Sequence, residues 1–326
     1  MSFSVLITGS SGYIGSHLVK YFKKNGASVF GIDLHFPPKN LQRYFDNHIV
    51  EDISSQKHVA EFLKKHKVDM VIHCAGKCLV AESVEKPDMY RDYNVTRANV
   101  FLQTCLDAAV SRFLFSSTAA TYGEPLQSPI PETHPQHPIN PYGQTKLDFE
   151  KILLLEQQKN KLCVGITRYF NVAGADPDIE IGEHHEPETH LIPNILTALM
   201  SGQPVPIYGG DYPTNDGTCV RDYIHVWDLA NLHWLLALKM IETNQGGIYN
   251  LGTTTGFSIM EVVQAAEKVL NKSASKKILP KRSGDPSTLI ADASKAKTEL
   301  GWQTSHSNLS DIIDTAYRWH QKKSDL

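Results

Sequence analysis

The sequence lacks long hydrophobic runs, cysteine pairs and blocks of one charge. None of its apolar stretches approaches the roughly 18 residues that span a bilayer, and its first residues show no export signal. Its 32 Lys plus Arg are balanced by 35 Asp plus Glu, without the dense basic patch typical of nucleic-acid binding. The cysteines are odd in number and form no C-x-x-C pair, which favours reduced thiols: Cys74, Cys78, Cys105, Cys163 and Cys219. We therefore expect a cytoplasmic protein that binds neither membranes nor nucleic acid.

What the sequence does contain is typical of a globular α/β protein. Apolar residues make up 41% and charged residues 21% of the chain, close to the average for folded domains. Short apolar runs alternate with longer helical stretches from residue 3 to 117, as parallel βαβ units require. The expected strands are 3–8, 28–33, 70–74, 112–117 and 164–169, and the clearest helices are 13–24 and 142–158. The pattern predicts a doubly wound Rossmann-type parallel sheet.

The alternation of expected strands and helices becomes irregular after Asn171, where Pro, Gly and His accumulate through residues 173–193. A chain of 326 residues accommodates two domains at about 100 to 200 residues each. We therefore expect a first domain over 1–171, to which the chain returns within 216–245, and a smaller C-terminal lobe over 172–326. Further elements expected after this point are helices 191–201, 226–242, 259–270 and 309–321, with strands near Pro206 and Ile248.

The first expected strand leads into a glycine-rich turn that opens the first helix. The positions expected to contact a cofactor are Gly9, Gly12, Tyr13, Ile14 and Gly15. Glycines allow a tight turn, so that a pyrophosphate can bind the N–H groups at the helix N-terminus. Asp33 ends the second strand, where a carboxylate accepts hydrogen bonds from a ribose and repels a 2'-phosphate. We expect NAD rather than NADP, with Asp52 and Ile53 either covering the adenine or forming a plain loop.

A tyrosine and a lysine four residues apart provide a candidate general base. Tyr142 and Lys146 share one helix face, and a neighbouring ammonium favours the phenolate over the neutral phenol. Thr118 leaves a strand at its carboxyl end, the side on which open α/β sheets bind ligands. We expect its hydroxyl to hydrogen-bond both a substrate hydroxyl and the tyrosine.

These motifs, together with longer blocks, resemble the extended short-chain dehydrogenase/reductase superfamily and, more closely, the UDP-glucose 4-epimerases. The blocks run along almost the whole chain: TGSSGYIGSH from Thr8, VIHCAG from Val71, ESVEKP from Glu82, FSSTAATYG from Phe115, PYGQTK from Pro141, RYFNVAGADPD from Arg168, ETHLIP from Glu188, YGGDYPTNDGTCVRDYIHV from Tyr208, YNLG from Tyr249 and RSGDP from Arg282. The long middle and late blocks are more specific than the glycine turn.

The resemblance implies C4 epimerisation of UDP-glucose and UDP-galactose through a 4-keto intermediate, with NAD as cofactor and a role in galactose metabolism. It makes 1–171 the NAD-binding domain and 172–326 the UDP-sugar lobe. Thr118, Tyr142 and Lys146 are the implied catalytic set. Further NAD contacts are implied at Cys74, Ala75, Gly76, Asn94, Ser116, Tyr142, Lys146 and Tyr169. Substrate contacts are implied at Thr118, Tyr142, Asn171, His190, Leu191, Arg221, Arg282, Asp285 and Leu289.

The family usually forms homodimers, which here would pair through residues 90–109 and 147–158. Leu289 occupies a wall position beside the sugar, and its intermediate size leaves turnover of N-acetylated sugars open. The chain departs from the family at Lys77, which is shifted by one residue, and at 34–38, which lack the usual asparagines.

Other activities on the same scaffold are a sugar-nucleotide 4,6-dehydratase, a non-enzymatic NAD sensor and a simple dehydrogenase. Dehydratases commonly have Asp-Glu beside the strand-end threonine, where this chain has Ala119 and Ala120. A sensor has no need of Tyr142 and Lys146. A related NAD-dependent epimerase or dehydrogenase acting on a different UDP-sugar stays open.

One group of residues close together in the sequence could in principle bind a metal ion: Glu183, His184, His185, Glu186, Glu188 and His190. Adjacent histidines on an irregular segment do not point to one centre without a specific fold, and no H-E-x-x-H spacing is present. We expect a solvated substrate loop there and no metal.

Overall fold

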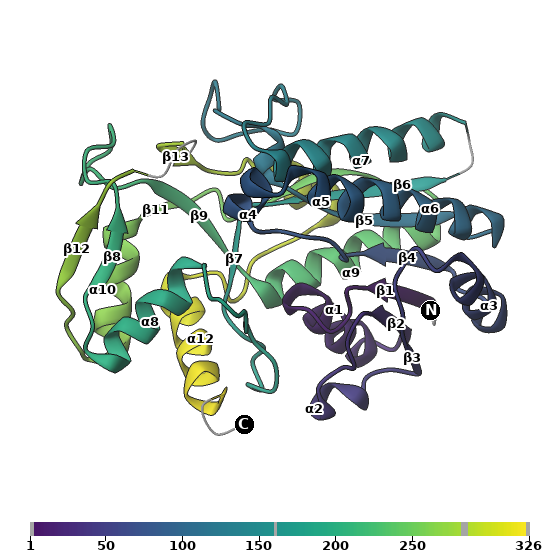
Figure 1. The fold of residues 1–326 in the computed structure, drawn as a ribbon, viewed down its shortest axis with the longest axis horizontal. Helices are drawn as coiled ribbons and strands as arrows, with labels where there is room; N and C mark the ends of the chain where they lie inside the picture. The colour runs from purple at the N-terminus through teal and green to yellow at the C-terminus, as the bar shows by residue number, and fades with distance from the viewer. Residues whose placement is uncertain (1–2, 160–161, 282–285, 324–326) are drawn as a thin grey trace. The chain divides into compact units, whose positions relative to one another are not determined.

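A computed structural model describes residues 3–159, 162–281 and 286–323, shown in Figure 1. The chain divides into two compact units. Unit 1 comprises 1–123, 135–169 and 230–249, and unit 2 comprises 124–134, 170–229 and 250–326. Residues 124–134 cluster with unit 2, although the sequence placed them in the first domain, and the chain returns to unit 1 at 230–249.

Unit 1 is built around a seven-stranded sheet in the order β10-β6-β5-β4-β1-β2-β3. Neighbouring strands from β6 to β3 pair in parallel, which confirms the expected doubly wound sheet. The strands are β1 (Ser4–Thr8), β2 (Ser28–Asp33), β3 (Asn47–Val50), β4 (Met70–His73), β5 (Arg112–Thr118), β6 (Cys163–Tyr169) and β10 (Gly247–Leu251).

Helices cover both faces of this sheet, so its strands are rich in buried apolar residues. One face packs against α3, α6 and α7, and α1 and α9 pack together on the other, where Phe22 meets Trp234. The helices are α1 (Tyr13–Lys24), α2 (Lys39–Gln42), α3 (Gln56–His66), α4 (Val80–Glu85), α5 (Pro87–Arg91), α6 (Ala98–Asp107), α7 (Pro141–Gln158) and α9 (Val226–Thr243). A π-helix spans Asp92–Arg97 and a 3₁₀ turn spans Ala119–Thr121.

The strand order reverses between β1 and β4, which creates a topological switch point. From β1 the chain moves outward to β2 and β3, then crosses back to β4 on the other side of β1. Thr8 and His73 are register partners, so the loops after them leave the same sheet edge side by side. Open α/β sheets bind ligands at such a point.

Unit 2 holds two smaller sheets and its own apolar core. In the larger, β9 pairs with β11, β13 and β7, and in the smaller, β8 pairs with β12. Helices α8, α10 and α12 pack together over them. The elements are β7 (Asn171–Ala173), β8 (Val205–Tyr208), β9 (Val220–His225), β11 (Gly256–Ser258), β12 (Lys276–Leu279), β13 (Thr288–Leu289), α8 (Leu191–Ser201), α10 (Ile259–Leu270), α11 (Ser294–Leu300) and α12 (Leu309–Lys323).

Across the described residues, none of the helices combines the length and the apolar character needed to cross a bilayer.

Candidate active site

The glycine turn after β1 is closed so tightly that side chains are excluded. Gly9 has a φ of +64°, a left-handed conformation that favours glycine, and a Cβ there would lie 2.8 Å from the backbone nitrogen of Ala75. At Gly15 a Cβ would lie 2.0 Å from the Gly9 carbonyl oxygen. The loops after β1 and β4 therefore meet at the switch point, as a dinucleotide site requires.

The residues around this turn fit NAD. No described side chain caps the N-terminus of α1, and its first turn has no acidic residue, so the end of the helix dipole suits a pyrophosphate. The Asp33 carboxylate accepts the backbone N–H groups of Ser11, at 2.9 Å, and of His35, at 3.0 Å. These bonds fix the carboxylate at the end of β2 while leaving Asp33 only half-buried.

Asp52 and Ile53 follow β3 and have partners within unit 1. Ile53 belongs to the apolar core. Burial opposes ionisation of Asp52, but hydrogen bonds from Ser54 and from Arg97, the latter at 2.6 Å, hold its pKa below its ordinary value. These contacts are compatible with both alternatives that the sequence left open, an adenine contact and a plain loop.

Thr118 and Tyr142 meet at the carboxyl end of β5. Tyr142 is the second residue of α7, whose N-cap Asn140 accepts the Gly143 N–H at 2.8 Å. The Thr118 hydroxyl accepts the Ala120 N–H at 3.1 Å and lies close enough to the Tyr142 phenol to act on its pKa. Burial raises the pKa of Tyr142 above its ordinary value, which the Thr118 hydroxyl opposes.

Lys146 lies one turn further along α7, in a different setting from the expected one. Its Nζ donates to the Ser116 carbonyl at 2.9 Å and lies 4.8 Å from the centre of the Phe115 ring. Burial lowers the pKa of Lys146 to about 8. The sequence predicted that this ammonium favours the Tyr142 phenolate, and burial of the phenol acts in the opposite direction.

A hydrogen-bonded chain links the ends of β4, β5 and β6 to α9. The Cys74 thiol lies 3.0 Å from the Ser116 hydroxyl, which accepts the Tyr169 hydroxyl at 2.8 Å. The same Tyr169 oxygen lies 2.6 Å from His233 Nε2. These hydrogen bonds join three of the predicted cofactor contacts, Cys74, Ser116 and Tyr169. His233 on α9 forms the last member of the chain. Nothing in the sequence marked His233, because it lies inside an ordinary apolar helix.

Asn94 holds the loop after β4 against α7. It lies in the π-helix, and its side chain accepts the Lys77 N–H at 2.8 Å and donates to the Lys77 carbonyl at 3.0 Å and to Thr145 at 3.1 Å. A Cβ on Gly76 would lie 2.9 Å from the Asn94 side-chain oxygen. Asn94 therefore positions the loop that carries Cys74, Ala75 and Gly76.

A buried ion pair that the sequence analysis missed joins α7 to the sheet. Arg168 on β6 donates to both carboxylate oxygens of Glu150, at 3.1 and 2.7 Å, and to the Tyr122 hydroxyl at 2.9 Å. Ser117 also hydrogen-bonds Glu150. Glu150 follows Lys146 by four residues and so shares its helix face, which is the one sequence signal that points to it.

In unit 2, three predicted substrate residues lie in the sheet around β9. Arg221 is the register partner of Leu289 on β13, and Asn171 on β7 pairs with Tyr223, two residues further along β9. The Arg221 side chain is buried and donates to the Val220 carbonyl at 2.8 Å. Arg282 and Asp285 lie outside the described residues.

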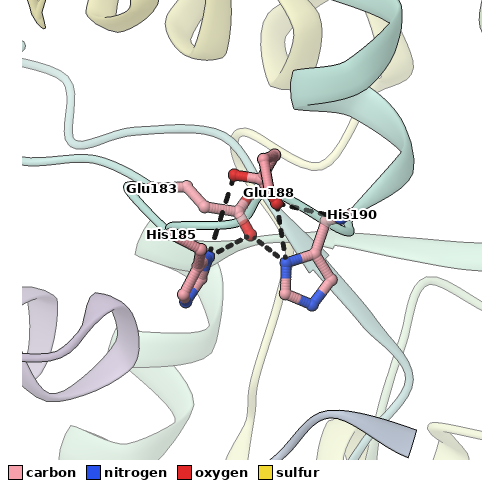
Figure 2. A group of neighbouring side chains, drawn as sticks. All are labelled: Glu183, His185, Glu188 and His190. Atoms are coloured by element: carbon pink, nitrogen blue, oxygen red, sulfur yellow. Dashed lines mark hydrogen bonds and ion pairs between the residues drawn. The ribbon is translucent and has the colours of Figure 1, made fainter. Parts of the chain in front are cut away.

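The predicted substrate residues His190 and Leu191 begin α8, with His190 as its N-cap. Figure 2 shows that His190 belongs to a cluster with Glu183, His185 and Glu188. Burial alone would lower the pKa of His190, but hydrogen bonds to Glu183 and Glu188 outweigh it and raise the pKa to about 10. The expected solvated loop is therefore a compact network in which Glu183 is buried.

The model of the NAD dependent epimerase/dehydratase family matches residues 5–252. The UDP-glucose 4-epimerase of Lactobacillus helveticus is 44% identical over 322 residues, which cover 97% of each chain. The structure of the UDP-glucose 4-epimerase from Brucella ovis in complex with NAD superposes with a TM-score of 0.91 at 40% identity, covering 97% of each chain. The enzyme from Stenotrophomonas maltophila, with bound NAD and formylated UDP-arabinopyranose, gives a TM-score of 0.94 at 34% identity, covering 99% of each chain. The chain therefore belongs to the NAD dependent epimerase/dehydratase family.

Proposed function

We propose that this protein is a UDP-glucose 4-epimerase, an NAD-dependent isomerase that interconverts UDP-glucose and UDP-galactose. One observation supports this proposal most directly: the half-buried Tyr142 at the start of α7 lies beside Thr118 at the end of β5, on the ligand-binding edge of the sheet in unit 1. The same edge carries the turn whose glycines exclude side chains. Relatives of this name match the chain over nearly its whole length.

The residues of unit 1 supply the acid–base chemistry. The glycine turn and Asp33 would hold NAD, whose chemistry when bound is reversible acceptance of a hydride from the sugar C4. Tyr142 removes the proton of the 4-hydroxyl, and Thr118 orients that hydroxyl. Burial opposes the phenolate, whereas the Thr118 hydroxyl favours it. We expect the positive charge of Lys146, on the same helix face, to favour the phenolate as well. Tyr142 then returns the proton after the 4-keto sugar has turned to present its opposite face.

The residues of unit 2 hold the nucleotide. Arg221 and Arg282 suit a diphosphate, because a guanidinium can donate two parallel hydrogen bonds to a phosphate. Asn171, the start of α8 at His190 and Leu191, and Asp285 complete the proposed contacts. Tight nucleotide binding with looser sugar binding is what turning of the keto sugar requires.

The alternative activities require other catalytic residues or leave the cofactor in another state. Elimination of water needs an acid and a base beside Thr118, where the 3₁₀ turn has Ala119 and Ala120. A dehydrogenase would accumulate reduced cofactor, whereas an epimerase regenerates its cofactor at every turnover.

The deciding experiment is incubation of the purified protein with UDP-galactose and no added cofactor, followed by separation of the products. We expect UDP-glucose to form without a lasting rise in absorbance at the NADH band. An oxidised sugar together with stoichiometric NADH would identify a dehydrogenase instead.

Sugar selectivity belongs to this proposal through Leu289. Leucine beside Arg221 leaves more room than tyrosine, so we expect UDP-glucose and UDP-galactose as main substrates with some turnover of the N-acetylated pair. Leu289→Tyr should lower kcat/KM for UDP-N-acetylgalactosamine relative to UDP-galactose by about 10- to 200-fold, as expected for filling methylene-sized space. If both activities fall together at a constant ratio, Leu289 supports the fold and does not select the sugar.

A homodimer and a cytoplasmic location also belong to the proposal. Leu155 on α7 lies within the segments expected to pair and is 54% exposed in the single chain. Leu155→Arg should shift the sedimentation coefficient from dimer to monomer, and an unchanged coefficient would exclude pairing through α7. The scattered cysteines are typical of a reducing compartment, which fractionation of the native cell would test.

A further inference from the structure

Four side chains that commonly ligate metals converge on one point in the segment that precedes α8. Glu183, His185, Glu188 and His190 each offer one oxygen or nitrogen atom, and these atoms all lie within 4.8 Å of one another. His190 Nδ1 lies 2.6 Å from Glu183 Oε1 and 3.4 Å from Glu188 Oε1. His185 Nδ1 lies 3.4 Å from Glu183 Oε1 and 3.9 Å from Glu188 Oε2. Figure 2 shows the four side chains pointing toward one another.

These separations suit a tetrahedral ion. Zinc bonds to nitrogen and oxygen are about 2.0 to 2.2 Å long, so the ligand atoms of a tetrahedral site lie about 3.3 to 3.6 Å apart. The four separations given above lie on either side of that value, with Glu188 presenting Oε1 to His190 and Oε2 to His185, and the shortest is the hydrogen bond between His190 and Glu183.

The types of ligand atom in this cluster favour zinc over other divalent cations. Two imidazole nitrogens with two carboxylates suit zinc, whereas magnesium and calcium prefer sites made of oxygen alone. Two ionised carboxylates balance the charge of a divalent cation when both histidines are neutral. The ion would then take the place of the proton on His190.

The backbone around the cluster is already fixed by other contacts. Trp319 of α12 donates to the Glu183 carbonyl at 2.9 Å. Glu188 Oε1 accepts the N–H groups of Thr189 and His190 at 2.8 and 2.9 Å, and Asn194 donates to the His190 carbonyl at 2.8 Å. Such supporting contacts hold ligands in place for an ion.

A second close group in the same unit has a different explanation. Asp176, Asp178 and Glu180 also lie close together, but they offer only carboxylates. Asp176 Oδ1 already accepts the N–H groups of Glu180 and Ile181, at 2.8 and 2.7 Å. That group lacks the imidazole nitrogens that favour zinc, and it carries no zinc proposal.

We propose that Glu183, His185, Glu188 and His190 form a structural zinc site that fixes the segment leading into α8. The site lies within one unit, and its role does not depend on the proposed epimerase activity. It would hold in place the chain that carries His190 and Leu191.

The first test measures metal binding by the full, untagged chain without any substrate. After treatment with EDTA and its removal, the protein is titrated with zinc against a chromophoric chelator, and bound zinc is measured by elemental analysis. We expect one zinc ion per chain. Absence of stoichiometric zinc binding would overturn the proposal and would leave the epimerase proposal untouched.

Single substitutions test whether the bound zinc lies at this cluster. His185→Ala and the nearly isosteric Glu183→Gln should each weaken zinc binding at least about 100-fold, since even the loss of an outer-shell contact costs 10- to 100-fold. His184→Ala is the matched control, because His184 faces Glu186, at 3.5 Å, rather than the cluster. Binding that is equal in all three variants, or that is lost instead in Cys78→Ser, would place the zinc elsewhere and overturn the assignment.

Binding of Co²⁺ in place of zinc tests the coordination geometry of the site. A four-coordinate Co²⁺ ion absorbs visible light far more strongly than the six-coordinate hydrated ion. We expect this strong absorption in the wild type and in His184→Ala and its loss in His185→Ala, with thermal unfolding of the metal-free proteins confirming that every variant folds. A weak, six-coordinate spectrum in the wild type would contradict the tetrahedral site.

Discussion

At the scale of single residues, the Tyr142 hydroxyl is the group on which the proposed chemistry depends. Tyr142→Phe removes one oxygen, and we expect the fold and the cofactor to be retained while turnover falls by about 10² to 10⁴, the usual contribution of a general acid–base group. The measurement is kcat for UDP-galactose, with bound dinucleotide and circular dichroism as controls. A variant retaining more than about a tenth of wild-type turnover would remove Tyr142 from the mechanism.

A second residue, His73, makes the stability of the fold depend on pH. His73 is 1% exposed, lies 2.8 Å from the Thr8 hydroxyl through Nδ1 and is surrounded by phenylalanine rings. Burial, and next the positive charge of Lys146, lowers the pKa of His73 to about 3. Below about pH 6.5 the unfolded chain therefore binds a proton that the folded chain does not, and stability falls with decreasing pH until about pH 3.

The slope of this loss approaches about 1.4 kcal/mol per pH unit between the two pKa values. His73→Asn retains a polar group near Thr8 but does not titrate. We expect acidification from pH 7 to 5.5 to lower the urea midpoint of the wild type more than that of the variant, since all other groups titrate in both. Equal shifts in the two proteins would show that His73 does not govern the acid response.

At the scale of elements, α7 is positioned by a close approach to the end of β5. A Cβ on Gly143 would lie 2.4 Å from the carbonyl oxygen of Ala120, which belongs to the 3₁₀ turn beginning just after Thr118. Gly143→Ala must therefore push α7 away from that turn, and with it Tyr142 from Thr118. A displacement of about 1 Å at a catalytic group can cost about 10²-fold in rate.

We therefore expect kcat to fall by about 100-fold in Gly143→Ala, with a modest loss of thermal stability. Gln144→Ala is the control, because Gln144 is exposed and contacts only the neighbouring turn of α7 through Asp148. Comparable rates for Gly143→Ala and Gln144→Ala would show that the close approach does not set the position of Tyr142.

At the scale of the whole molecule, a cofactor that is regenerated at each turnover has no need to leave. We expect the purified protein to release NAD on denaturation, and Asp33 to exclude NADP because its carboxylate repels a 2'-phosphate. Assaying the denatured supernatant for both dinucleotides tests this. Removing NAD should also lower Tm by mass action, and adding NADP should not restore it. Recovery of NADP from the protein would reverse the assignment of Asp33.

The sequence by itself determined the features that depend on neighbouring residues. The helix 13–24 and the strand 28–33 have the limits that the sequence predicts. The glycine turn and the spacing of Tyr142 and Lys146 are local as well, because a tight turn and a shared helix face need only a few consecutive residues. Such features leave a periodic signal in the sequence.

Only the tertiary structure decided which distant residues share a buried environment. Glu150 and Arg168 pair across α7 and β6, and His233 completes a hydrogen-bonded chain that begins at Cys74, just after β4. Neither the ion pair nor His233 has a distinctive sequence neighbourhood. The segment 183–190 has no regular period, so its sequence indicated a solvated loop, and its folded backbone brings two histidines and two glutamates to one point. The physical reason is that burial and charge depend on what packs around a side chain, and packing between distant segments leaves no period in the sequence.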